Sequence, residues 1–560
     1  MGEHKTSYRE IEHFTDIEAW KIDREISGKL YRIIKMLHDE KKYWLGSHKS
    51  KAVVLFLISL LLSLNLTRCE RVQRAREKGK VVIGTYLQPA PLDPLMTRGT
   101  ISAALVDLLY NSPVRLSERF EPVPELAESW EIRGDGVRWI LHLRRGVLFH
   151  DGEEFGAEDV VFTYKTLKRL RGDEFENLKE IRKIDRYTVE ITLKQADVVS
   201  LLYWLRTPIV SRRSYPGAEG IKAVGTGPFK LKEWMADDRI VFESNGDYFE
   251  GEPEVQQIVV RIYEGYEALL SAFLQGQVDV PYLIDAADVR LVEDNPKFQV
   301  SRVPNFHYYA VLFNLRDPLF KGKKMRRALC YAVDREELLR TALMGRGTLV
   351  YSPFSSPIWR DTSEAQGYDP GTAERLLKEL GWRRDAADGL FKRGGKPLGF
   401  ELVYYSGNPL LKKIATSLWL QFQRFGIKVE LASMEARDLL ERRLRPLNYQ
   451  LALFYLNAGS DPDFASRFLA SAQIGDYNFS GYTNQAVDSL FAIGRRTFDM
   501  EKRKEIYRQI DMILRDERPM FPLVSGMGFV VASSRVKDLW PLRNEALLKS
   551  ARYWKVKPGG

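Results

Sequence analysis

One stretch of the sequence, residues 124–166, constrains the fold of this chain more than any other. Its apolar residues Trp139, Leu141 and Leu143 stand at every second position, which is the period of a strand with one buried face. Two turn signals follow, each ending in glycine. Residues 157–170 then show helical spacing behind an acidic first turn, which suits the positive end of a helix. We therefore predict a strand, a turn and a helix, and we find no catalytic group in this unit.

A dense series of residues in the same stretch stands in a fixed order with almost no gaps. The series comprises Glu128, Ser129, Trp130, Asp135, Gly136, Trp139, Leu143, Arg144, Gly146, Val147, Phe149, His150, Asp151, Gly152, Phe155, Ala157, Asp159, Val160, Phe162 and Tyr164. It closely resembles a signature of the solute-binding proteins of peptide and nickel ABC transporters, the extracellular solute-binding protein family 5. Further blocks resemble the family in the expected order, beginning at Gly225, Phe313, Ser460, Asn478 and Arg503. The resemblance covers residues 80–560.

This resemblance implies an α/β, two-lobed periplasmic-binding-protein-like fold with an extra inserted domain. The chain is expected to cross between the lobes twice, near Val303-Pro304 and near residues 525–528. Two crossing strands make a hinge, and ligands bind in the cleft between the lobes. The expected boundaries are residues 80–108, 225–303 and 530–560 for lobe I, 109–224 for the inserted domain and 304–529 for lobe II.

A single strongly apolar run, Ala52–Leu66, lies near the N-terminus between basic flanks. It is shorter than the ~20 residues that span a bilayer, and it fits the apolar region of a secretory signal. Cys69 stands where a lipoprotein signal would carry its lipid, although Arg68 occupies a position that small residues normally hold. We expect residues 49–69 to be a signal peptide or membrane anchor. Cleavage, lipidation at Cys69 and retention all stay open.

Residues 1–48 precede this signal and do not belong to it. Their helix-prone segment carries Phe14, Asp16, Ile17, Ala19, Trp20, Arg24, Glu25 and Tyr31. It resembles the first helix of the small four-helix-bundle proteins associated with intervening sequences of ribosomal RNA. Because one helix cannot close a bundle, we interpret residues 1–48 as a fused fragment or the product of a misassigned start codon. Met36 is then an alternative start.

Composition and charge indicate an ordinary globular protein. The 560 residues include 85 Lys and Arg against 75 Asp and Glu, giving a net charge of +10 that is scattered along the chain. A nucleic-acid footprint needs basic residues gathered on one face, so we expect no nucleic-acid partner. The two cysteines exclude a disulfide-rich scaffold and a cysteine-based zinc site. We expect Cys330 to be a small core residue.

Signals for catalysis are weak. Four of the seven histidines precede the apolar run, and the sequence has no Walker A loop, Gly-x-Ser-x-Gly elbow or Cys-x-x-Cys motif. The glycine turn at residues 225–228 lacks a following Lys-Ser/Thr, which indicates a structural turn. We therefore predict no enzyme activity, no cofactor and no metal ligands.

Binding chemistry is better represented just after the first predicted crossing. Asn305, His307 and Tyr309 stand close together there, followed by Asn314. Aromatic and amide side chains suit a cleft that holds a peptide backbone by hydrogen bonds and apolar contacts. Core packing is an equal alternative for Tyr309, because it shares a strand face with Val311 and Phe313. We take Asn305, His307, Tyr309 and Asn314 as candidate ligand-binding residues.

A second candidate region is the Asn-Ala-Gly-Ser-Asp-Pro-Asp segment at residues 457–463. In peptide-binding members of the family, an aspartate shortly before the Asp-Pro pair holds the ligand's α-amino group. The resemblance puts that position at Ala458, beside Asn457, so recognition of a free peptide amine is in doubt. Asn457, Ala458 and Asp461 are the candidates here. Asp461 and Asp463 are alternatively residues that cap or support the structure.

The resemblance implies a periplasmic substrate-binding component of an ABC transporter. It would capture an oligopeptide-like solute by hinge closure and deliver it to the membrane permease subunits. We expect a monomer that is associated with the membrane through its N-terminal segment. The alternatives are a carrier of a nickel chelate, a sugar or another non-peptide solute, and an exported hydrolase.

Overall fold

Residues 1–78 and residues 79–560 form two separate units, and the computed structural model describes the second. The described ranges are 79–97, 100–117, 121–134, 136–215, 223–303, 305–354, 359, 367–539 and 547–557. The predictions for residues 1–48, for the signal or anchor at 49–69 and for Cys69 lie outside them. Within the described ranges, no helix combines the length and apolar character that a bilayer crossing needs.

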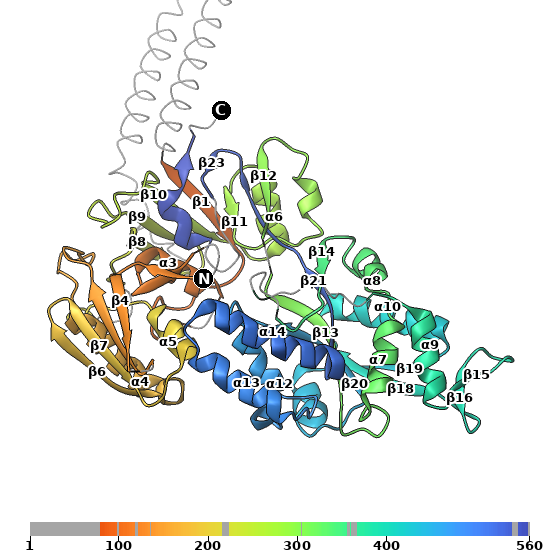
Figure 1. The fold of residues 1–560 in the computed structure, drawn as a ribbon. Helices are drawn as coiled ribbons and strands as arrows, with labels where there is room; N and C mark the ends of the chain where they lie inside the picture. The colour runs from red at the N-terminus through yellow and green to blue at the C-terminus, as the bar shows by residue number, and fades with distance from the viewer. Residues whose placement is uncertain are drawn as a thin grey trace, which may run out of the picture. The chain divides into compact units, whose positions relative to one another are not determined.

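Lobe I is built on a five-stranded sheet with the order β11-β1-β10-β9-β8 (Figure 1). β1 runs parallel to β10 and β11, and its Val-Val-Ile segment is β-branched and mostly buried, as suits a central parallel strand. The elements are β1 (Lys80–Thr85), α3 (Thr100–Leu109), β8 (Phe229–Met235), β9 (Arg239–Ser244), β10 (Gln257–Ile262), α6 (Tyr266–Leu274) and β11 (Val280–Pro281). Strands from distant parts of the chain thus share one sheet.

The inserted domain carries a four-stranded antiparallel sheet in the order β4-β5-β7-β6. The strand and helix predicted from the sequence are confirmed here as β5 (Arg138–Leu143) and α4 (Ala157–Leu170). Buried residues of this sheet and of lobe I, such as Leu141 and Val81, belong to one continuous core. Lobe I and the inserted domain therefore pack as one body. The other elements are β2 (Val114–Leu116), β3 (Pro122–Pro124), β4 (Ala127–Arg133), η3 (Gly172–Phe175), β6 (Leu178–Asp185), β7 (Thr188–Leu193) and α5 (Val198–Leu205).

Lobe II is built on a six-stranded sheet in the order β14-β21-β13-β20-β18-β19. Successive residues of the central strand β13 face opposite cores: Tyr309 packs with α7 to α10, and Tyr308 packs with α13 and α14. The strands are β13 (His307–Phe313), β14 (Gly347–Leu349), β18 (Gly399–Tyr405), β19 (Lys428–Met434), β20 (Leu451–Asn457) and β21 (Met520–Gly526). The main helices are α7 (Lys323–Tyr331), α8 (Arg335–Ala342), α9 (Pro370–Glu379), α10 (Pro409–Phe425), α13 (Gln485–Arg496) and α14 (Met500–Glu517).

Short elements complete lobe II, except that the first of them, η5, belongs to lobe I. They are η5 (Val289–Leu291), β15 (Arg383–Arg384), β16 (Phe391–Arg393), β17 (Lys396–Pro397), α11 (Ala436–Asp438), η6 (Leu439–Leu444), η7 (Pro462–Ala465), α12 (Ser466–Leu469) and η8 (Ser471–Gln473). Two local predictions are confirmed. Asp334 caps α8 by accepting hydrogen bonds from the Glu336 and Glu337 amides at 2.9 and 3.0 Å. Cys330 is a core residue with 1% of its surface exposed.

A two-stranded antiparallel ribbon joins the sheets of the two lobes. Its strands are β12 (Phe298–Val303), which leads toward β13, and β22 (Gly528–Ser533), which follows β21. Val303 at the end of β12 is the register partner of Gly528 at the start of β22. The two connections between the lobes therefore lie side by side.

The C-terminal segment is tied back to the inserted domain by a buried ion cluster. Glu125, which is fully buried, faces Lys549 at 3.3 Å and Arg552 at 3.5 Å, both from the segment that carries η10 (Leu548–Tyr553). Burial alone would raise the pKa of Glu125, but the two cations and the Ser112 hydrogen bonds lower it to about 2. The antiparallel pair of β23 (Val536–Lys537) and β24 (Lys555–Val556) flanks the same segment.

The glycine turn at residues 225–228 packs closely against Leu109, and His150 hydrogen-bonds to its backbone. A Cβ on Gly225 would lie 1.9 Å from the Leu109 carbonyl oxygen, so only glycine fits there. The Nε2 atom of His150 lies 3.1 Å from the Gly227 carbonyl oxygen, while the Gly225 N–H donates to Nδ1 at 3.3 Å. Burial lowers the pKa of His150 to about 4, so the ring is neutral at pH 7.

Candidate functional site

A group of aromatic and amide side chains gathers where β13 begins and β20 ends, beside the connection between the lobes. The register pairs His307 with Asn457 and Tyr309 with Tyr455, which puts these four side chains on one face of the sheet. The same face continues into the core beneath α7 to α10. We call the group the aromatic–amide cluster; it consists of Asn305, His307, Tyr309, Asn408, Tyr455 and Asn457.

Ring contacts and amide hydrogen bonds hold the cluster together. The Tyr455 ring stacks on His307 with centroids 5.0 Å apart and an interplanar angle of 12°, and it also contacts Tyr309 at 4.8 Å. Asn305 Oδ1 accepts the His307 backbone N–H at 3.0 Å, and the Asn305 side chain also hydrogen-bonds Tyr455. Asn408, which caps α10, hydrogen-bonds the Tyr309 hydroxyl. Tyr455 remains 38% exposed and Asn457 is also exposed, so the cluster presents one open side.

All six members of the aromatic–amide cluster are uncharged at neutral pH. Burial lowers the pKa of His307 below its ordinary value, so the imidazole is neutral. Burial raises the pKa of Tyr309 to about 12 and shifts that of Tyr455 in the same direction. The cluster therefore offers flat apolar faces and neutral hydrogen-bonding groups, and no fixed charge.

Asn314, which the sequence groups with these residues, lies at the opposite end of β13. Its amide donates to the carbonyl oxygens of Leu447 and Tyr449 at 2.8 and 2.7 Å, and its oxygen accepts the Arg316 N–H at 3.0 Å. The side chain is 4% exposed and lines a cavity of about 320 Å³. Because β13 rises ~3.3 Å per residue, the two ends lie roughly 20 Å apart. The structure does not bring Asn314 together with the cluster.

The loop after β20, residues 459–466, contains two aspartates that are paired with arginines of the same lobe; we call it the aspartate loop. Asp461 accepts hydrogen bonds from both terminal nitrogens of Arg503 at 2.6 and 2.7 Å, and it caps η7. Asp463 accepts a hydrogen bond from Arg495 at 2.8 Å and another from the Tyr507 hydroxyl at 3.1 Å. Burial raises the pKa of Asp463, which the arginines oppose. The structure thus gives both aspartates supporting contacts.

Ala458, between the cluster and the aspartate loop, is 3% exposed, and its methyl group belongs to the core under α13 and α14. Its backbone N–H donates to the Phe306 carbonyl at 3.0 Å. The open side chain at this bend is Asn457, whose Oδ1 accepts the Gly459 N–H at 2.9 Å. Gly459 has φ +62°, and a Cβ there would lie 2.6 Å from the Phe464 ring.

Two members of the cluster, Tyr455 and Asn408, were not identified from the sequence. The sequence of Leu451–Asn457 is apolar or aromatic as far as Leu456, so it does not mark Tyr455 as a residue that stays exposed; only the folded strand shows this. Asn408 gives only a helix-start signal before Pro409. Its contact with Tyr309 depends on the pairing of strands, which a local pattern does not contain.

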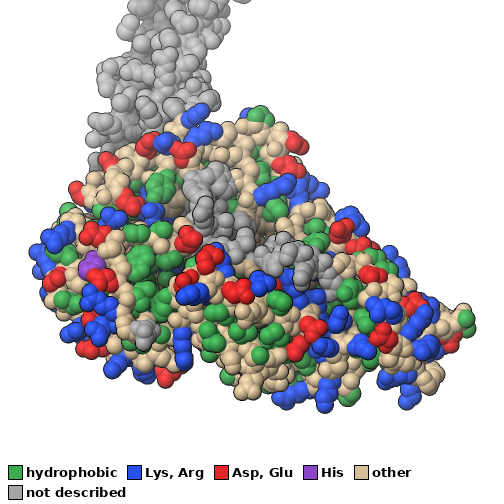
Figure 2. Space-filling view, viewed as in Figure 1, with side chains coloured by type: hydrophobic (Ala, Val, Ile, Leu, Met, Phe, Trp, Pro, Cys, Tyr) green, Lys and Arg blue, Asp and Glu red, His purple; other side chains and the backbone are tan. Residues whose placement is uncertain are grey.

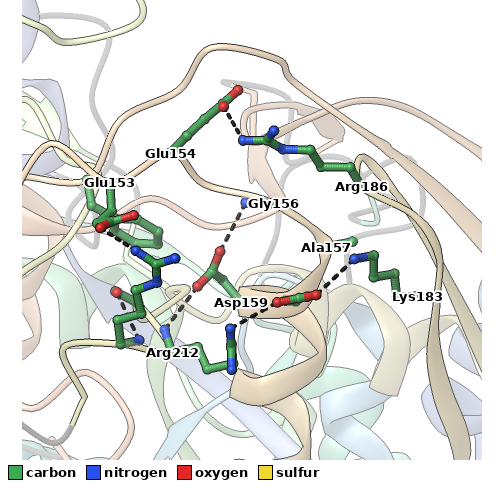
Figure 3. A pocket seen from close by; sticks show the side chains of 12 residues that line it. Glu153, Glu154, Gly156, Ala157, Asp159, Lys183, Arg186 and Arg212 are labelled. Carbon is green, nitrogen blue, oxygen red and sulfur yellow. Dashed lines mark hydrogen bonds and ion pairs between the residues drawn. The ribbon is translucent and has the colours of Figure 1, made fainter.

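A charged cavity of about 340 Å³ lies in the inserted domain at the start of α4 (Figure 3). Glu158 pairs with Lys183 at 2.9 Å and with Arg212 at 3.0 Å, while Glu154 pairs with Arg186. Asp159 accepts the backbone N–H groups of Gly156 and Arg212 at 3.0 and 2.9 Å. These charges satisfy one another and stabilise the signature segment.

On the face shown in Figure 2, Lys and Arg side chains intermingle with Asp and Glu. Among the described residues, no three His, Cys, Asp or Glu side chains are grouped to hold a metal ion.

Comparisons with known proteins agree with this architecture. A family model described as "Bacterial extracellular solute-binding proteins, family 5 Middle" matches residues 121–476. The oligopeptide-binding protein AppA of Bacillus subtilis is 26% identical over 504 residues, covering 84% of this chain and 92% of that protein. Heme-binding protein A of Haemophilus influenzae is 27% identical over 522 residues, covering 85% and 92%.

Solved structures show the same fold. AppA from Bacillus subtilis in complex with a nonapeptide has a TM-score of 0.64 at 25% identity, covering 85% of this chain and 99% of that one. NikZ from Campylobacter jejuni in complex with Ni(L-His) has a TM-score of 0.68 at 24% identity, covering 86% and 100%. The prediction of a two-lobed periplasmic-binding-protein-like α/β fold with an inserted domain is confirmed. Since the family model spans more than half of the sequence, the chain belongs to the bacterial extracellular solute-binding proteins of family 5.

Proposed function

We propose that this protein is the extracytoplasmic solute receptor of an ABC transporter and that it captures an oligopeptide-like solute at the aromatic–amide cluster. The observation that carries the proposal is the position of the cluster: an open, uncharged patch beside the paired connections between the lobes. The relatives named for oligopeptide and peptide transport support this cargo class. Delivery to membrane permease subunits follows from the same proposal.

The chemistry of the cluster suits a peptide backbone. A backbone presents N–H donors and C=O acceptors, and an asparagine side chain offers both. Tyr455, stacked on His307, adds a flat apolar surface for a cargo side chain. Because none of the six side chains is charged, the cluster recognises the middle of a peptide better than its charged ends.

The domain boundaries and the hinge are part of this proposal. Lobe I comprises residues 80–108, 225–303 and 530–560, the inserted domain residues 109–224, and lobe II residues 304–529. The β12–β22 ribbon supports a hinge at this point, since Val303 and Gly528 are paired where both connections leave it. Closure of the lobes over the cluster would remove cargo from water without a chemical step, so we propose binding without turnover and without a cofactor.

Export and membrane association complete the proposal. The apolar run Ala52–Leu66 with its basic flanks supports an exported protein whose N-terminal segment associates with the membrane. The receptor would act as a monomer on the permease and would have no nucleic-acid partner.

A flat non-peptide solute is the second candidate cargo. The nearly parallel rings of His307 and Tyr455 favour it, because they expose a planar face as well as hydrogen-bonding groups. Relatives named for heme, or solved with Ni(L-His), illustrate such cargoes in similar proteins.

Native mass spectrometry of the protein as purified tests the cargo class directly. We expect a bound peptide-like mass that is released on denaturation. Calorimetry with a panel of unmodified pentapeptides then measures affinity for Tyr455→Ala, which we expect to bind about thirtyfold more weakly, since a buried aromatic contact of this kind contributes about 2 kcal/mol. Tyr477→Ala is the control, because Tyr477 is a 46% exposed aromatic residue of lobe II outside the cluster. Turnover of the peptides, or equal affinity of Tyr455→Ala and the unmodified protein, would reject the proposal.

A further inference from the structure

Phe498, in the turn between α13 and α14, contacts the other half of the molecule. Its ring lies 5.5 Å from the Trp139 ring at an angle of 54°. Among the described residues of lobe II, Phe498 is the one apolar side chain that packs against the core shared by lobe I and the inserted domain. Figure 1 shows the ends of α13 and α14 beside α5 of the inserted domain.

The surface that receives Phe498 is shaped for an aromatic ring. Gly136 is buried at φ +92°, and a Cβ at this position would lie 2.1 Å from Cε2 of Phe498. The Trp139 indole N–H donates to the Gly136 carbonyl at 3.1 Å, which fixes the turn, and Trp139 is 2% exposed. Both residues belong to the signature segment of the sequence, yet neither lies near the aromatic–amide cluster along the chain.

Two arginines tie the Phe498 turn to the aspartate loop. Arg495, at the end of α13, binds Asp463 and the Ser466 hydroxyl, each at 2.8 Å. Arg503, in the first turns of α14, binds Asp461 through two hydrogen bonds. The loop itself follows β20, which carries Tyr455. The position of Phe498 is therefore coupled to the part of lobe II that carries the cluster.

A polar contact flanks the ring. Arg496, the last residue of α13, lies 3.5 Å from the Gln195 side-chain oxygen of the inserted domain. Gln195 precedes α5, whose cap Asp197 accepts the Val199 and Ser200 amides at 3.0 Å. The contact thus has an aromatic centre and a polar edge, the arrangement that is common in protein interfaces.

We propose that Phe498 and the Gly136–Trp139 turn form a closing latch between lobe II and the inserted domain. The ring occupies the turn in the closed arrangement and leaves it when the lobes part, so the contact sets the fraction of closed molecules before cargo arrives. The inference rests on the proposed lobe motion and does not depend on which cargo is bound. Removing the ring is expected to lower the ratio of closed to open molecules about tenfold, because partial burial of an aromatic side chain is lost.

Distance measurement between two spin labels tests the latch in the full chain without cargo. Labels at Ile184→Cys in the inserted domain and Met512→Cys in lobe II report the separation, since these side chains are 50% and 52% exposed. Cys330 is buried, and a Cys69→Ser background removes the second native cysteine. We expect Phe498→Ala to move population from the short to the long distance and Phe498→Leu to have an intermediate effect.

The control for this experiment is Tyr477→Ala, which removes an exposed aromatic ring of lobe II and should leave the distances unchanged. Thermal melting of each variant verifies that it is folded. Identical distance distributions for Phe498→Ala and the parent would overturn the latch, even if cargo binding is intact. A shift without any cargo binding would support the latch and count against the proposed cargo instead.

Discussion

The aromatic–amide cluster and the aspartate loop both adjoin the end of β20, yet they use polar groups in opposite ways. In the cluster, neutral side chains contact one another and keep one side open, as the 38% exposure of Tyr455 shows. In the loop, Asp461 and Asp463 are each bound by an arginine. The charged residues therefore support the structure, while the uncharged residues keep one side exposed.

Desolvation explains this division. A charge that is removed from water needs a partner and further hydrogen bonds, so a carboxylate beside a closing cleft is costly unless a cation accompanies it. A neutral amide or phenol at a half-open edge has no such requirement and can exchange water for a ligand at small cost.

The largest expected effect comes from breaking the charged region. Arg503 is 3% exposed at its side chain, and Arg503→Met leaves Asp461 without its partner. We expect the free energy of unfolding to fall by about 3 kcal/mol, measured by urea denaturation, because one half of a buried ion pair is then uncompensated. Arg508→Ala, which removes an exposed pair with Glu505, is the matched control and should cost less than about 0.5 kcal/mol. Equal losses for the two variants would mean that the aspartate loop does not depend on its buried charge.

A second test extends the comparison to pH, through His150 in the signature turn. Its pKa of about 4 lies below that of an unfolded histidine, so the unfolded chain binds more protons as the pH falls from about 6.5 toward 4. The contribution of neutral His150 is complete above pH 7 and falls by on the order of 3 kcal/mol toward pH 4.

His150→Gln should therefore flatten the pH dependence of unfolding over this window, whatever it does to the stability at pH 7. His307→Gln is the matched variant from the cluster. It should also reduce the loss of folding stability at acidic pH, because burial lowers the pKa of His307 as well. Unfolding curves whose pH slope is the same with and without His150 would contradict this account of its burial.

Acetylation of a peptide's amino terminus is expected to change the binding affinity only slightly. If the cluster is uncharged and the aspartates are occupied, an N-acetylated pentapeptide and its free-amine twin should bind within about tenfold of each other. Calorimetry with the paired peptides measures this ratio. A free-amine peptide that binds more than about a hundredfold tighter would show that a carboxylate, Asp461 or Asp463, is available to cargo after all.

Sequence reasoning was strongest where the signal is local. The two-residue period predicted β5, the acidic first turn predicted the start of α4, and the sequence also predicted the cap at Asp334. Each of these features depends on neighbours within one or two turns. Only part of the aromatic–amide cluster could be predicted from the sequence. Asn305, His307 and Tyr309 follow one another along the chain, but Tyr455 and Asn408 join them through strand pairing and a helix start that no short window contains.

Asn314 illustrates the opposite difficulty. It follows the cluster residues closely in the sequence. Because a strand is the most extended form of the chain, the seven residues of β13 separate Asn314 from the cluster by the length of the strand. Closeness along a strand is thus a poor guide to closeness in a site, whereas register between strands is a good one.

The buried ion cluster of Glu125, Lys549 and Arg552 has a consequence for the order in which the protein is made. The sheet of lobe II takes its strands from residues 307–526, so all of them have been synthesised before the end of the chain emerges. Lobe I and the inserted domain, in contrast, wait for the last dozen described residues to supply the cations for Glu125. Since domains fold as units during synthesis, the second lobe can mature first and the first lobe is finished last. A chain truncated before Lys549 would therefore lack both cations for Glu125, which lies in the half of the molecule that is synthesised first.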